Sequence, residues 1–163
     1  MPTLWRKDGS EKLVCSSQMN VGIRCGSLGD QDCDVYAEEK NRSFGMLKGF
    51  SLDLLIDPHD ESKVFISVPP KMPGMTCQTD VKAYEFLEGA YEAVIMDTYQ
   101  RGLNSVCFSD LGCRWQKWGS IQSAHAARKV IEKLSWLPDD FTILFVVPAK
   151  EVEVWDSVMD FDV

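Results

Sequence analysis

The sequence has no long hydrophobic run and no excess of positive charge. None of its 163 residues lies in a stretch close to the roughly 18 consecutive apolar residues that a membrane-spanning helix needs. The first ten residues lack the apolar core of a secretory signal peptide. A net charge of −8 argues against non-specific binding to nucleic acid, which needs a basic surface. We therefore expect an intracellular protein of the cytoplasm or nucleus, with no membrane and no nucleic-acid partner.

The cysteines and histidines form no metal-binding pattern. The six cysteines include no Cys-x-x-Cys pair, and the two histidines are not spaced with them as a zinc site requires. We therefore expect no metal and no cofactor, and reduced thiols throughout. Cys107 lies in an apolar strand pattern typical of a buried cysteine, and Cys113 is the one candidate for a reactive thiol. No pairing of nucleophile and base, or of acid and base, emerges, so no catalytic residue is assigned.

Strand and helix patterns alternate from residue 64 onward. This alternation indicates right-handed crossovers and a largely parallel sheet packed against helices. At this length the chain is most simply one domain, residues 1–163. The expected strands are 64–68, 106–108 and 141–147, and the expected helices are 79–101, 120–134 and 149–159.

The first third of the chain has weaker signals. Asn20–Cys25 and Cys33–Ala37 have the composition of strands, and the turn-rich segment 26–31 joins them. Residues 51–56 fit either a helix end or a strand. Asp34 is expected to have a structural role, accepting hydrogen bonds from backbone N–H groups of a neighbouring turn.

The loop Gly112–Gly119 is the strongest candidate for a binding site. It follows a strand and opens directly into a helix, and a helix N-terminus attracts anions such as phosphate. In the functional interpretation, Arg114 contacts the anion, Trp115 stacks on a base, and the N–H groups of Gly119 and Ser120 hold phosphate. Trp118 would also stack or cap the cleft. In the alternative interpretation, both tryptophans pack the loop onto the body and the cations are solvated.

Several segments together resemble the macrodomain family over about residues 20–160. Gly26–Leu28 followed by Asp34 resembles the family's first turn and strand, and Arg101–Phe108 resembles a later strand. Further similarity lies in Val64–Pro70, Leu87–Tyr91, Ala126–Ala127 and Phe145–Val147. The resemblance implies a three-layer α/β/α sandwich with a mixed central sheet.

The resemblance also implies binding of ADP-ribose, of a related nucleotide, or of an ADP-ribosylated protein. The implied ligand-binding residues are Ser27, Asn41, Gly45, Gly112, Arg114, Trp115, Gly119 and Ser120. Asn41 matches a contact to the distal ribose, although an asparagine at this place is also a common turn former.

Some positions depart from the family pattern. Ser27 stands where members carry the aspartate that accepts from the adenine amine, and Glu38 replaces the first asparagine of the family's Asn-Ala-Ala-Asn segment. Of the family's glycine triplet, only Gly45 and Gly49 remain. Macrodomain hydrolases use the asparagine and the glycine loop to place a water against the distal ribose. We therefore expect no efficient ADP-ribosyl hydrolysis, the one enzymatic activity that the resemblance suggests.

A second class of function stays open. The nucleotide site could have decayed on a scaffold that now recognises a protein, or less readily RNA because of the acidic charge. Exposed Trp115 and Trp118 would then be the anchors, since tryptophan is enriched among the residues that dominate interface energetics.

Overall fold

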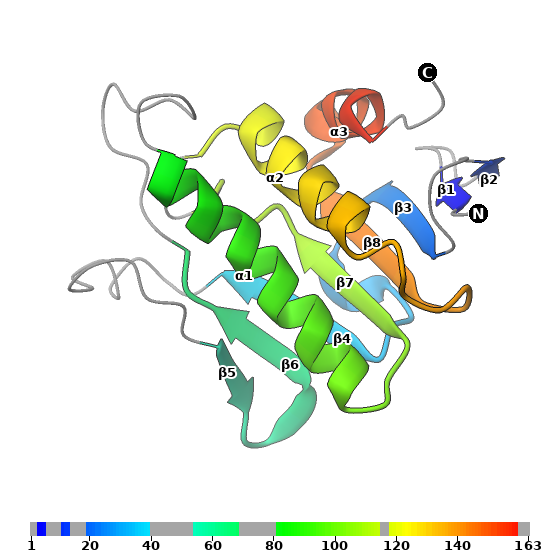
Figure 1. Ribbon diagram of the computed structural model, residues 1–163, viewed down its shortest axis with the longest axis vertical. Coiled ribbons are helices and arrows are strands. Elements are labelled where there is room, and N and C mark those ends of the chain that lie inside the picture. The colour runs from blue at the N-terminus through cyan, green and yellow to red at the C-terminus, as the bar shows by residue number, and fades with distance from the viewer. Residues whose placement is uncertain are drawn as a thin grey trace.

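The computed structural model describes residues 3–5, 11–13, 19–39, 54–68, 81–114 and 118–159. These residues form one eight-stranded sheet with helices packed on it (Figure 1). The strand order across the sheet is β2-β1-β3-β8-β7-β4-β6-β5. The strands are β1 Thr3–Trp5, β2 Glu11–Leu13, β3 Asn20–Cys25, β4 Val35–Glu39, β5 Leu54–Asp57, β6 Asp60–Ile66, β7 Ser105–Ser109 and β8 Thr142–Val147.

The sheet is mixed. Strands β1, β3, β8, β7, β4 and β6 run parallel to their neighbours, and antiparallel β2 and β5 close the two edges. The parallel centre agrees with the alternation of strands and helices in the sequence. It also brings the carboxyl ends of four central strands to one edge of the sheet.

Three helices pack against the sheet. They are α1 Val81–Gln100, α2 Ser120–Lys133 and α3 Val152–Val158. Helices α1 and α2 lie side by side across one face of the sheet, and α3 packs beside α2 (Figure 1). Two short 3-10 turns follow the ends of strands: η1, Leu28–Asp30, comes after β3, and η3, Ala149–Glu151, comes after β8.

The core lies between the sheet and these helices. Because successive strand residues point to opposite faces, one row of neighbouring residues turns toward the helices. That row is apolar and at most 1% exposed: Ile23, Phe145, Phe108, Ala37 and Val64. Aromatic rings join the layers, with centroid distances of 5.1 Å from Tyr91 of α1 to Phe108 and 5.0 Å from Phe145 to Trp155 of α3.

The sequence predicted most of these elements. The three helices and strands β3, β4, β7 and β8 lie where their patterns indicated, within a few residues at each end. The ambiguous segment 51–56 is a strand, β5, where it is described. The expected strand at 64–68 begins earlier, because Asp60–Ile66 pairs as a hairpin with β5. Strands β1 and β2 have only three residues each, too few to show a periodicity, and were not predicted.

The expectation of reduced thiols is wrong at one pair of cysteines. Cys33 and Cys107 form a disulfide, with their Cα atoms 6.2 Å apart. Cys107 lies on β7 opposite Tyr36 of β4, and Cys33 precedes β4. The two cysteines are 74 residues apart in the sequence. Sequence spacing does not pair cysteines, and the parallel pairing of β4 with β7 is what brings these two together.

Opening this disulfide should lower the free energy of unfolding by about 2 kcal/mol, because the bond restricts the unfolded chain. Urea denaturation with and without reductant measures the difference. Cys33→Ser should remove the effect of reductant, and Cys25→Ser, which changes an exposed free thiol, should not. Peptide mapping of the unreduced protein that finds no link between the peptides of Cys33 and Cys107 would contradict the assignment.

Candidate functional site

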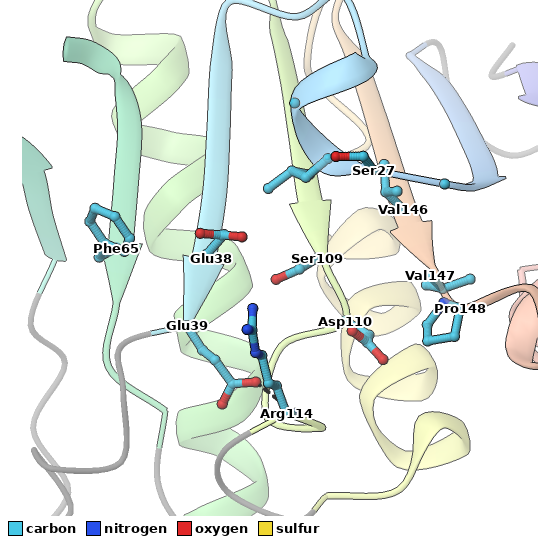
Figure 2. Close-up of a pocket in the computed structure, with 13 residues that line it drawn as sticks. Ser27, Glu38, Glu39, Phe65, Ser109, Asp110, Arg114, Val146, Val147 and Pro148 are labelled. Atoms are coloured by element: carbon cyan, nitrogen blue, oxygen red, sulfur yellow. Dashed lines mark hydrogen bonds between the residues drawn. The ribbon is translucent and has the colours of Figure 1, made fainter.

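The carboxyl ends of the central parallel strands border a cavity of about 560 Å³. Phe65 of β6, Glu38 of β4, Ser109 of β7 and Val146 of β8 are neighbours across the sheet and point away from the helix face. Figure 2 shows these side chains around the cavity, with Ser27 above them. In open α/β sheets, ligands bind outside the carboxyl ends of the strands.

The turn that follows β3 forms one wall of the cavity. Gly26 has a φ of +122°, a conformation that residues with a Cβ rarely adopt, and it leads the chain from β3 into η1. The Gln31 side chain donates to the carbonyl of Ser27 (3.3 Å), and the Tyr36 hydroxyl donates to the carbonyl of Gln31 (2.5 Å). These bonds fix Ser27 and Leu28 at the cavity wall.

Asp34 has the structural role expected of it. Its carboxylate accepts the N–H of Asn104 (3.0 Å), in the turn between α1 and β7. Its own N–H donates to the hydroxyl of Ser105 (2.7 Å). These bonds join the start of β4 to the start of β7, at the end of the sheet away from the cavity.

A closed ring of hydrogen bonds holds the loop that follows β7. The Ser123 hydroxyl donates to the carbonyl of Leu111 (2.6 Å), and the N–H of Leu111 donates to the Tyr91 hydroxyl (3.0 Å). The 2.5 Å contact between the two hydroxyls closes the ring. Because Ser123 uses its one proton on Leu111, Tyr91 is the donor in that contact. Burial raises the pKa of Tyr91 well above its ordinary value, so the hydroxyl keeps this proton.

The next residues aim Arg114 at the cavity. The N–H of Arg114 donates to the buried carboxylate of Glu39 (2.9 Å), which ends β4. Figure 2 shows the guanidinium rising from this point toward Glu38 and Ser109. The loop therefore presents a cation at the cavity because its backbone is fixed at both Leu111 and Arg114.

Trp118 is not available to a ligand or a partner, so its expected role as an exposed anchor or stacking residue is wrong. Its side chain is only 3% exposed. Its ring lies over Gly112 and meets Tyr84 edge-on at a centroid distance of 6.3 Å, and its N–H donates to the carbonyl of Gly112 (2.9 Å). The alternative interpretation, that this tryptophan packs the loop onto the body, holds for Trp118.

A second cavity, of about 530 Å³, lies beside the start of α2. It shares Asp110, Arg114 and Pro148 with the first cavity, so the two are adjoining. Gly119 and Ser120 line this second cavity. The N–H of Gly119, which we expected to face a phosphate, donates instead to the Gln122 side chain (3.0 Å).

The predicted site residues therefore do not all converge. Ser27 and Arg114 line the first cavity, and Arg114, Gly119 and Ser120 line the second. Gly112 is buried under Trp118, where it shapes the loop. Asn41, Gly45 and Trp115 lie outside the described residues, so their roles stay predictions.

Two acidic residues at the site were not predicted. Glu39 and Asp110 line the first cavity together with Glu38. Burial raises the pKa of Asp110, and the nearby negative charge of Glu151 adds to this. The available signal was positional: Glu39 ends β4 and Asp110 directly follows β7. With three carboxylates near one guanidinium, this site is more acidic than a phosphate-binding site is expected to be.

Cys113, the one candidate for a reactive thiol, is a poor nucleophile here. Burial raises its pKa to about 12, and the adjacent carboxylate of Asp110 contributes to the increase. At neutral pH the sulfur therefore stays protonated, and only the thiolate reacts readily.

Two broader findings concern the described part of the chain. No group of three or more His, Cys, Asp or Glu side chains within it is arranged to hold a metal ion. None of its helices is long and apolar enough to cross a membrane.

No protein-family model matches the sequence, and no curated protein matches it significantly. Solved structures do match. The Oceanobacillus iheyensis macrodomain with ADP superposes with a TM-score of 0.69 at 12% identity, covering 90% of this chain and 93% of that one. The chain has the macrodomain fold. This confirms the three-layer α/β/α class with a mixed central sheet that the resemblance implied.

Other macrodomain structures agree. The macro domain of ganglioside induced differentiation associated protein 2 has a TM-score of 0.65 at 15% identity, covering 85% of this chain and 82% of that one. The Trypanosoma brucei macrodomain in complex with ADP has a TM-score of 0.58 at 13% identity, covering 85% of this chain and 68% of that one. At such low identity the macrodomain likeness shows the architecture, and the ligand has to be argued from the site.

Proposed function

We propose that this chain binds ADP-ribose, or a related adenine nucleotide, in the cavity at the carboxyl ends of β3, β4, β7 and β8. The observation that carries the proposal is the cavity itself, because its volume of about 560 Å³ falls within the usual range for small-molecule sites. The Oceanobacillus iheyensis and Trypanosoma brucei macrodomains have ADP in the matching structures. The proposed partners are ADP-ribose itself or an ADP-ribosylated protein of the cytoplasm or nucleus.

The two adjoining cavities suit the two halves of such a ligand. Phe65 and Val146 offer apolar surface to a base in the first cavity, and Ser27 and Glu38 offer polar groups for hydrogen bonds. Arg114, at the junction, supplies the charge-assisted donor that a phosphate requires. The adenosine half would therefore occupy the first cavity, with the phosphates passing Arg114 toward the second.

Binding without efficient hydrolysis is the form of this function that the residues favour. Glu38 points into the first cavity and carries a carboxylate where hydrolytic macrodomains, by the resemblance, carry an asparagine. A carboxylate accepts hydrogen bonds but does not donate them, so it does not replace the amide in ordering a ribose hydroxyl and a water. The alternative role in protein recognition has lost the support of Trp118, which is buried.

Arg114→Ala should weaken ADP-ribose binding by about 2 kcal/mol, or roughly thirtyfold in Kd, if the guanidinium binds a phosphate. Isothermal titration calorimetry measures the change. Lys129→Ala is the matched control, because it removes an equal charge from the exposed face of α2 and should leave the affinity unaltered. Titrations with NAD, ATP and poly(ADP-ribose) compare related ligands. Affinity no tighter than millimolar for all of them would contradict the proposal.

A further inference from the structure

Asp110 stands where the two cavities meet. It directly follows β7 and lines both cavities. Its main-chain carbonyl accepts the N–H of Cys113 (3.2 Å), so the turn that carries the carboxylate is closed by a hydrogen bond. A ligand that extends from the first cavity into the second therefore has to pass this side chain.

The surroundings of Asp110 contain few positive charges. Within its own loop it accepts a hydrogen bond from the thiol of Cys113, which stays protonated, and Arg114 lines the same two cavities. From β4 the carboxylate of Glu39 lines the first cavity, and from η3 Lys150 and Glu151 line the second, as does uncharged Ser120 of α2. Burial, and then the charge of Glu151, raise the pKa of Asp110.

A carboxylate at this junction acts differently on the two halves of a nucleotide. A phosphate close to an ionised carboxylate is repelled, and the partly buried setting strengthens that repulsion relative to water. An uncharged nucleoside in the first cavity does not meet this repulsion. Protonation of the carboxyl would remove the repulsion and leave a hydrogen-bond donor facing the phosphate.

We propose that Asp110 determines the charge of the ligand that this site accepts. Ionised, it allows the nucleoside half to bind but holds the diphosphate weakly; protonated, it allows the whole of ADP-ribose to bind. The inference rests on the proposed function, since it assumes that a nucleotide spans both cavities. Diphosphate binding then requires Asp110 to take up a proton, so affinity rises as pH falls through the pKa of this carboxyl in the bound complex. Below its pKa in the free protein, affinity no longer depends on pH.

Calorimetric titration with ADP-ribose and with adenosine, between about pH 7.5 and pH 5, tests this inference. The diphosphate bridge of ADP-ribose does not titrate in this range. We expect the ADP-ribose affinity of the wild type to rise about tenfold toward pH 5 and the adenosine affinity to stay constant. Asp110→Asn should bind ADP-ribose about tenfold more tightly than the wild type near pH 7.5 and lose most of the pH dependence.

Two controls separate the possible failures. Asp139→Asn removes an equal charge at an exposed position before β8 and should leave the pH profile of the wild type unaltered. ADP-ribose binding that is equally tight at every pH, with Asp110→Asn equal to wild type, would overturn this inference and leave the proposed function standing. Absence of binding by both ligands at every pH would overturn both. The wild-type profile alone decides the matter if Asp110→Asn does not fold.

Discussion

Replacing Gly112 by alanine should lower the free energy of unfolding by about 4 kcal/mol. The residue has a φ of +87°, where a Cβ is strained by roughly 1–2 kcal/mol. A Cβ at this position would also lie 2.6 Å from Cδ1 and 3.0 Å from Cγ of Trp118. The indole is buried and has little room to move, so overpacking adds about 1–3 kcal/mol. Urea denaturation of the variant gives the value.

Gly102→Ala is the matched control for this experiment. Gly102 also has a positive φ, +78°, but an added Cβ there would have nothing within 4 Å. This variant should lose only the backbone part, about 1 kcal/mol. The difference between the two variants isolates the contact with Trp118. Equal losses at Gly112 and Gly102 would show that Trp118 does not pack on Gly112 as described.

Ser123→Ala should lower the free energy of unfolding by about 3 kcal/mol. The hydroxyl is fully buried, and its removal leaves the carbonyl of Leu111 without its donor and the Tyr91 hydroxyl without its acceptor. A buried polar group that loses its partner costs about 1–3 kcal/mol. Because this ring fixes the loop before Arg114, ligand affinity should fall as well. Thermal and urea unfolding, together with calorimetric titration, measure the two effects.

Tyr84→Phe controls for the loss of a hydroxyl between the same two helices. The Tyr84 hydroxyl is only partly buried, and its bond to the carbonyl of Gln122 is long, at 3.4 Å. We expect a loss of about 0.5 kcal/mol or less. Tyr91→Phe combined with Ser123→Ala should cost less than the sum of the single changes, because both belong to one ring. Strict additivity would contradict a closed ring.

Much of the fold could be predicted because its elements have clear periodicities. The apolar run of β8 and the helical spacing of α2 each identify an element without reference to the rest of the chain. Strand pairing is different, because it depends on contacts between distant segments. The position of β1 between β2 and β3, and the Cys33–Cys107 bond, follow from such pairing and have no local signal.

The site was harder to predict than the fold. Arg114 and Ser27 could be found because a loop before a helix and a turn after a strand are usual places for ligands. Trp118 could not be placed, since a tryptophan in a glycine-bounded loop packs inward or outward according to what lies beneath it. Here Gly112 leaves the space that the indole fills. Asp110 looked unremarkable in the sequence, and only its place between two cavities gives it a role.

The central claim is that an adenine nucleotide binds at the carboxyl edge of the sheet. The most direct test is a titration of the ¹⁵N-labelled protein with ADP-ribose, followed by NMR through the amide shifts. We expect the largest shifts at Gly26–Gly29, at Ser109–Arg114 and at Val146–Lys150, with the outer faces of α1 and α2 unchanged. No shifts at millimolar ADP-ribose, or shifts centred on the outer faces of these helices, would contradict the claim.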